Sequence, residues 1–158
     1  MPPKILVIRL SSLGDIVLTA PVYRSLKARW PDCKISLLVK PGLAPALEGH
    51  SCIDEIIPFV SVGQALAKIR KEGFTHLLDL HANLRSTVLR TLAAVPKTSV
   101  YRKASLARRL YVALGLRSPS LEKHTVERYL EALAVWGVPP APAALRPADV
   151  PGAGRPFG

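Results

Sequence analysis

An uninterrupted apolar run near the start of the chain constrains the fold most. Residues 5–8, Ile-Leu-Val-Ile, show no polar alternation, so a strand formed here must be buried on both faces. Strands of that kind belong to parallel sheets that helices cover. The run is followed by Ser-Ser-Leu-Gly-Asp at residues 11–15 and then by a helical pattern that reaches residue 30. This order predicts the first strand–helix unit of such a sheet.

The alternation of strand and helix patterns continues along the chain. We predict strands at residues 4–10, 34–39, 53–59, 75–80 and 99–101, and helices that end near residues 30 and 48 or cover residues 62–71, 83–93, 106–114 and 124–136. Strands that alternate with helices predict an α/β fold with a doubly wound parallel sheet.

Proline and glycine set two of the predicted boundaries. Pro21 interrupts the first helical stretch, so we predict a short turn after Gly14 and a new helix with Thr19 near its N-cap and Pro21 in its first turn. Gly73 is expected to end the helix over residues 62–71.

The length of 158 residues suits one domain with a sizeable core. From residue 139 onward, proline alternates with alanine and glycine and no apolar periodicity remains. We therefore predict a domain over residues 1–138 and a linker or tail over residues 139–158. No apolar run approaches the roughly 20 residues that cross a bilayer, and the first residues do not form a secretory signal, so we expect a cytoplasmic protein.

The charge of the chain favours an anionic partner. Lys and Arg total 22 against 11 for Asp and Glu, which gives a formal net charge of +11. Nucleic acid, a membrane surface and an acidic glycan all remain compatible with this charge. A basic region at residues 97–117 carries no RRM-like or KH-like signature, so no specific nucleic acid is expected.

Cysteine and histidine give no sign of a metal site. Cys33 and Cys52 match neither a metal-binding nor a redox spacing, and the four histidines are scattered. We expect two reduced thiols and no bound metal.

Two polar segments follow predicted strands, where a doubly wound sheet binds its ligands. In the first, Gly14 would permit a tight turn through a left-handed backbone, while Ser11 and Ser12 supply hydroxyl groups. Asp15 could take a proton from a sugar hydroxyl. Spacing alone favours a different role for Asp15, as a cap at the start of the following helix.

The second polar segment covers residues 81–85. Arg85 could bind carboxylates or phosphates bidentately, with a solvated helix face as the alternative, and Asn83 could line the same cleft as His81. Arg90 is expected on the solvated face. Asp79 lies inside an apolar strand, so we expect a hydrogen-bonded structural carboxylate and not a second catalytic group.

The first segment resembles the N-terminal signature of the lipopolysaccharide heptosyltransferases, glycosyltransferase family 9. That signature is a basic-hydrophobic strand, then Ser-Ser-x-Gly-Asp, then Thr-x-Pro. It stands here as Arg9, Ser11, Ser12, Gly14, Asp15, Thr19 and Pro21. Residues 75–86 resemble the family's second landmark, and His124 with Arg128 resembles a feature before the interdomain linker, so the likeness covers residues 4–138.

The resemblance implies a GT-B fold of two Rossmann-like domains, of which this chain would be the N-terminal, acceptor-side half. It implies inverting, metal-independent transfer of heptose from ADP-heptose to an anionic lipopolysaccharide core, with Asp15 as the general base. Ser11, Ser12, Gly14, Asn83 and Arg85 would contact substrate, and no cofactor is implied. The acceptor is a glycolipid, so the protein would lie peripherally on the inner face of the inner membrane. The nucleotide-sugar domain, which binds most of the donor, is absent from this sequence, so we expect no turnover from this half alone.

A non-catalytic module that binds polyanions or glycans through its basic face is the alternative. Saturable binding of an oligosaccharide core would favour the transferase, whereas binding of any nucleic acid with a steep salt dependence would favour the module. The Ser-Ser-x-Gly-Asp loop favours the transferase, because a general polyanion binder does not need it.

Overall fold

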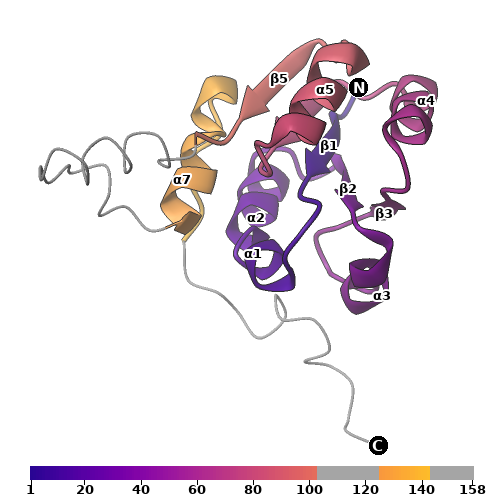
Figure 1. Cartoon of the computed structure of the whole chain (residues 1–158). Coiled ribbons are helices and arrows are strands. Elements are labelled where there is room, and N and C mark those ends of the chain that lie inside the picture. Colours follow the sequence, from indigo (N-terminus) through magenta and orange to yellow (C-terminus); the bar gives the residue numbers. More distant parts are fainter. Residues whose placement is uncertain (103–124, 143–158) are drawn as a thin grey trace, which may run out of the picture.

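The computed structural model describes residues 1–102 and 125–142 (Figure 1). Within them, five strands form one sheet in the order β3-β2-β1-β4-β5, and every neighbouring pair is parallel. The strands are β1 Lys4–Ile8, β2 Lys34–Val39, β3 Glu55–Pro58, β4 His76–Asp79 and β5 Lys97–Val100. The predicted α/β fold with a doubly wound parallel sheet is confirmed.

Helices cover both faces of the sheet, with α1, α2 and α7 on one face and α4 and α5 on the other (Figure 1). The α-helices are α1 Leu13–Val17, α2 Ala20–Arg29, α3 Ala44–Leu47, α4 Val62–Glu72, α5 Leu84–Ala93 and α7 Thr125–Glu131. Two short 3₁₀ helices are η1 Pro41–Leu43 and η3 Ala134–Trp136. The predicted helix over residues 106–114 lies outside the described residues.

The apolar run in β1 supplies both layers of the core. Successive side chains of a strand point to opposite faces. Ile5 and Val7 accordingly join the apolar cluster beneath α2 and α7, while Leu6 and Ile8 join the cluster beneath α4 and α5. All four residues are fully buried, as the absence of polar alternation predicted.

The proline-directed boundary lies where it was predicted. Thr19 occupies the N-cap position of α2 and Pro21 lies in its first turn, while the short helix α1 fills the segment before it. The Thr19 hydroxyl does not cap the helix. It lies 2.8 Å from the Tyr23 hydroxyl, and both groups are buried.

The two tryptophans pack around a histidine near the amino end of β4. The His76 ring centroid lies 5.3 Å from that of Trp30 and 4.9 Å from that of Trp136. Both tryptophans therefore have a packing role in the structure.

Helix α4 has a cap at each end. The Ser61 side chain accepts a hydrogen bond from the Gln64 backbone N–H at 3.3 Å. At the other end Gly73 has a φ of +65°, in the left-handed region that side chains disfavour. The predicted end of this helix at Gly73 is confirmed.

Replacing Gly73 with alanine is expected to lower the free energy of unfolding by about 1 kcal/mol, because alanine must adopt the left-handed conformation. Gly63→Ala is the matched control. Gly63 lies inside α4, and a Cβ there meets no atom within 4 Å. That substitution should stabilise the chain by up to about 1 kcal/mol. Urea unfolding of the two variants measures both effects. Equal effects of the same sign would contradict the capping role.

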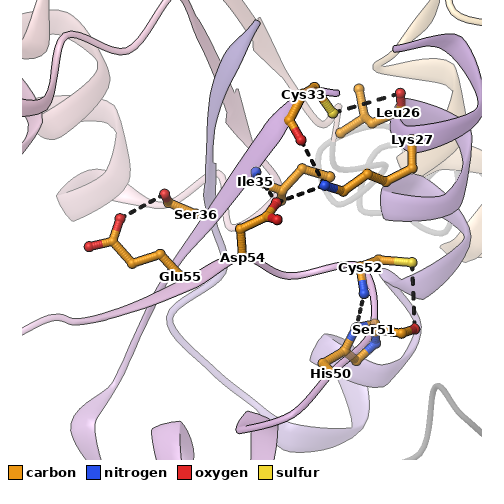
Figure 2. A network of polar contacts seen from close by, with 10 residues as sticks. All are labelled: Leu26, Lys27, Cys33, Ile35, Ser36, His50, Ser51, Cys52, Asp54 and Glu55. Atoms are coloured by element: carbon orange, nitrogen blue, oxygen red, sulfur yellow. Dashed lines mark hydrogen bonds and ion pairs between the residues drawn. The ribbon is translucent and has the colours of Figure 1, made fainter. Parts of the chain in front are cut away.

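A polar network fastens α2 to the amino end of the sheet (Figure 2). The Lys27 ammonium donates to the Asp54 carboxylate at 2.8 Å and to the Cys33 carbonyl at 2.7 Å. The same Asp54 oxygen accepts the Ile35 backbone N–H at 2.7 Å. Burial acts to raise the pKa of Asp54, but the bonds from Lys27 and Ile35 outweigh it, so the pKa lies below its ordinary value.

The lowered pKa of Asp54 links stability to pH. The folded state holds the carboxylate ionised more strongly than the unfolded state does, so its contribution is present above about pH 4 and is lost as the pH falls through the folded pKa. Asp54→Asn should therefore destabilise the chain at pH 7 and make less difference at pH 3. Urea unfolding at both values tests this. Asp32→Asn, at an exposed aspartate nearby, is the control. A destabilisation by Asp54→Asn that does not change with pH would contradict the linkage.

Candidate functional site

The two polar segments lie side by side at the point where the strand order reverses. From the central strand β1 the chain first builds β2 and β3 on one side, and then crosses to β4 on the other. Ile8 at the end of β1 pairs with Asp79 at the end of β4. In open α/β sheets this switch point is where ligands bind. The structure thus brings residues 11–15 and 81–85 together at the carboxyl end of the sheet, as predicted.

Asp15 lies in the first turn of α1 and faces back toward Ser12. Its Oδ2 atom accepts hydrogen bonds from the Ser12 backbone N–H at 3.3 Å and from the Ser12 hydroxyl at 3.0 Å. The capping role that spacing favoured is therefore present. The side chain remains 38% exposed, so capping and contact with a ligand are compatible.

Arg9 pairs with Asp15 across the loop. One terminal guanidinium nitrogen lies 2.6 Å from Asp15 Oδ2, and the other terminal nitrogen donates to the Leu80 carbonyl at 2.7 Å. The guanidinium carbon lies 5.7 Å from the centre of the Tyr129 ring. With its side chain only 9% exposed, Arg9 joins the loop after β1, the loop after β4 and helix α7.

The sequence interpretation counted Arg9 as part of the strand signature and missed its pairing with Asp15. The available signal was an arginine placed directly after a fully apolar strand. A charge in that position must find a partner when the strand is buried.

The contacts of Asp15 keep it ionised. Burial acts to raise its pKa, but the hydrogen bonds from Ser12 and the positive charge of Arg9 outweigh burial, so the pKa of Asp15 lies below its ordinary value. All three contacts converge on Oδ2. Within the described part of the chain, Oδ1 accepts no hydrogen bond, which leaves one carboxylate oxygen available to a ligand.

The reason given for Gly14 was wrong. Gly14 lies inside α1, and its φ is not among the positive values found at Gly49, Gly73 and Gly137. The strand-to-helix turn is made by residues 9–12, before the glycine, so no left-handed backbone is needed. Gly14 is exposed, and a Cβ there meets no atom within 4 Å. Because Gly14 has no side chain, the backbone at this position is open to the approach of a ligand. Ser11 is half-buried beside it.

Asn83 and Arg85 occupy the start of α5 at the same end of the sheet. The Asn83 side chain accepts the Ser86 N–H at 2.9 Å, and the Ser86 hydroxyl accepts the Asn83 N–H at 3.0 Å, which forms a capping box. Arg85 is exposed. The structure thus gives Asn83 a structural partner and leaves Arg85 at the surface.

Asp79 is fully buried and hydrogen-bonded, as predicted. Its Oδ1 atom accepts the backbone N–H groups of His81 at 3.0 Å and Ala82 at 2.8 Å. The expectation that Arg90 lies on a solvated face was wrong. Its side chain is 23% exposed and lies 3.6 Å from Asp79 Oδ2, because a buried carboxylate draws in the nearest cation.

A hollow of about 230 Å³ lies between the end of β5 and helix α7. It is lined by Ser99, Val100, Arg102, Arg128, Glu131, Ala132 and Val135. Arg128 belongs to the third stretch of family resemblance. His124, its partner in that stretch, lies outside the described residues.

The described residues hold no group of three or more His, Cys, Asp or Glu side chains that could bind a metal ion. Cys33 and Cys52 are both free thiols. In the part of the chain described, every helix is too short or too polar to span a membrane.

Solved structures share this architecture. A glycosyl transferase family 9 protein from Veillonella parvula matches 90% of this chain with a TM-score of 0.66 and 21% identity. The E. coli ADP-heptose lps heptosyltransferase II matches 94% with a TM-score of 0.64 and 24% identity, and E. coli heptosyltransferase WaaC with ADP matches 90% with a TM-score of 0.67 and 20% identity. The fold is that of a Rossmann-like half of a GT-B protein.

The matched GT-B proteins are longer than this chain. It covers 43% of the Veillonella protein, 44% of heptosyltransferase II and 51% of WaaC. The chain thus spans about half their length. The resemblance seen in the Ser-Ser-x-Gly-Asp segment is confirmed at the level of the fold. The sequence matches no protein-family model and no curated protein.

Proposed function

We propose that this chain is the acceptor-side domain of a sugar-nucleotide glycosyltransferase and that Asp15 is its general base. The observation that carries the proposal is an ionised carboxylate at the switch point of a GT-B domain, held through Oδ2 by Arg9 and Ser12 with Oδ1 left available. A base must be deprotonated and positioned near the hydroxyl that it activates.

The reaction would proceed by direct displacement. Asp15 Oδ1 takes the proton from an acceptor hydroxyl, and the acceptor oxygen attacks the anomeric carbon from the face opposite the nucleotide. The new C–O bond forms as the bond to the diphosphate breaks, which inverts the anomeric configuration. Arg9 and Ser12 would fix the direction of the carboxylate, at the cost of some basicity, because both also stabilise its charged form.

For the donor we propose ADP-heptose, the sugar nucleotide named for the E. coli heptosyltransferase II structure. This chain spans about half the length of the matched proteins. We propose that a second domain binds most of the nucleotide. No metal or other cofactor enters the proposed mechanism, so the diphosphate charge would be stabilised by side chains of that domain.

For the acceptor we propose an anionic lipopolysaccharide core carried on a glycolipid. The net charge of +11 would attract it, and exposed Arg85 lies in the first turn of α5, where no acidic residue offsets it. Arg102 and Arg128 line the hollow beside α7. Such an acceptor places the reaction on the cytoplasmic face of the inner membrane, with the protein attached peripherally.

The test starts from the longest product of the reading frame that contains this chain. It is incubated with ADP-heptose and an anionic lipid A–Kdo core, and heptose transfer is measured by mass spectrometry. Transfer that disappears in Asp15→Asn and persists in Asp32→Asn supports the proposal. The absence of transfer, even with a separate donor domain supplied, together with binding of any nucleic acid at a steep salt slope, would favour the polyanion-binding module.

A further inference from the structure

We infer that Asp79 is a positioning residue for the candidate base, Asp15. Asp79 holds the turn after β4, and this turn fixes the Leu80 carbonyl that binds Arg9 beside Asp15. The proposed reaction does not directly use Asp79, the Leu80 carbonyl or Arg90. The meaning of this positioning for catalysis rests on the proposed function, but the positioning itself can be measured without any activity.

The first step is the turn. Asp79 is fully buried at the end of β4, and its Oδ1 atom accepts two consecutive backbone N–H groups, from His81 and Ala82. Ala82 has a φ of +48°, a conformation that a residue with a Cβ disfavours. The two hydrogen bonds hold the turn in that conformation, so the path of residues 80–82 depends on the Asp79 carboxylate.

The second step is the carbonyl of Leu80, between the turn and β1. The Leu80 N–H donates to the Ile8 carbonyl at 3.1 Å, and its own carbonyl accepts from the Arg9 guanidinium at 2.7 Å. Arg9 therefore has one nitrogen on Leu80 and another on Asp15 Oδ2, at 2.6 Å. If the Leu80 carbonyl shifted, Arg9 would lose this hydrogen bond, and its guanidinium would no longer be held in place beside Asp15.

Arg90 supplies the counter-charge that this arrangement needs. A buried negative charge is costly unless a cation lies close to it. The Arg90 guanidinium lies 3.6 Å from Asp79 Oδ2. That distance is long for a direct hydrogen bond, so the pairing is one of charge, while Oδ1 keeps its two N–H donors.

A through-space effect of Asp79 on Asp15 would have the opposite sign from positioning. Removal of a nearby negative charge alone lowers the pKa of a carboxyl group. Loss of the turn moves Arg9 away from Asp15 and raises that pKa. Asp79→Ala removes both the charge and the acceptor, whereas Asp79→Asn removes the charge and keeps an acceptor oxygen for His81 and Ala82. The two variants share the loss of the pair with Arg90.

The experiment is a carboxyl-carbon NMR titration of Asp15 in the full 158-residue chain and in both variants. We expect Asp79→Ala to raise the Asp15 pKa toward its ordinary value and Asp79→Asn to leave it unchanged or lower. Amide spectra confirm that each variant is folded. If Asp79→Ala does not fold, Asp79→Ser replaces it, since its hydroxyl can accept one of the two N–H groups, and a smaller rise is expected.

An Asp15 pKa that stays unchanged or falls in a folded Asp79→Ala or Asp79→Ser variant would overturn the inference. A rise of equal size in Asp79→Asn would overturn it too, because the acceptor oxygen would then be irrelevant. Failure of the proposed function shows separately, as heptose transfer that survives Asp15→Asn while the pKa shifts are as expected.

Discussion

Asp15→Asn is expected to lower the kcat of sugar transfer by about 10²- to 10⁴-fold, the usual contribution of a general base. Asparagine keeps the size of the side chain and an oxygen that can accept from Ser12, so the first turn of α1 should persist. KM for the acceptor should change much less than kcat. Steady-state rates on the longest product of the reading frame measure both constants.

Asp32→Asn provides the matched control for this prediction, because Asp32 is an exposed aspartate in the turn before β2. The same isosteric change there should leave kcat within about twofold of the unaltered protein, as surface substitutions usually do. A kcat for Asp15→Asn within tenfold of the unaltered protein would remove Asp15 as the base and leave it only its capping role.

Arg9→Met is expected to lower the free energy of unfolding by about 3 kcal/mol, the second large effect. Methionine can fill the buried space but leaves the Leu80 carbonyl without its donor and Asp15 without its cation. Because Asp15 is 38% exposed, water recovers part of the second loss. Urea unfolding at pH 7 measures the change, and the Asp15 pKa should rise in the same variant.

Arg70→Met is the corresponding control. Arg70 is exposed on α4 and donates to the Leu92 carbonyl at 3.0 Å near the surface. Its loss should cost less than about 1 kcal/mol. Equal costs for the two arginines would show that Arg9 is not held by the buried contacts described for it.

Most of the fold could be predicted because its determinants are local in the sequence. The apolar run of β1, Pro21 at the start of α2 and Gly73 at the end of α4 each act through their own backbone or burial preference. The last predicted helix was less well defined. It covered residues 124–136, whereas the structure divides residues 125–136 into α7 and η3, since the Leu133 and Trp136 N–H groups bond three residues back.

The candidate site was predictable only in part, since it depends on contacts between segments distant in the chain. The capping role of Asp15 follows from a spacing of three residues to Ser12. Its pairing with Arg9 depends on the loop path, and the bond from Arg9 to Leu80 joins residues 71 positions apart. Arg90 was misplaced for the same reason. Helical periodicity does not reveal that Asp79 is buried beneath Arg90.

The apolar clusters on the two faces of the sheet are completed at different stages of synthesis. The described members of the cluster beneath α4 and α5 all come from residues 6–95, whereas the cluster beneath α2 and α7 also needs residues 129–138. Synthesis proceeds from the N-terminus, so one face of the sheet can close while the other still waits for α7. Tyr129, which lies beneath Arg9, arrives with that late helix. On the ribosome, Arg9 can therefore pair with Asp15 and with the Leu80 carbonyl before its aromatic neighbour has been synthesised.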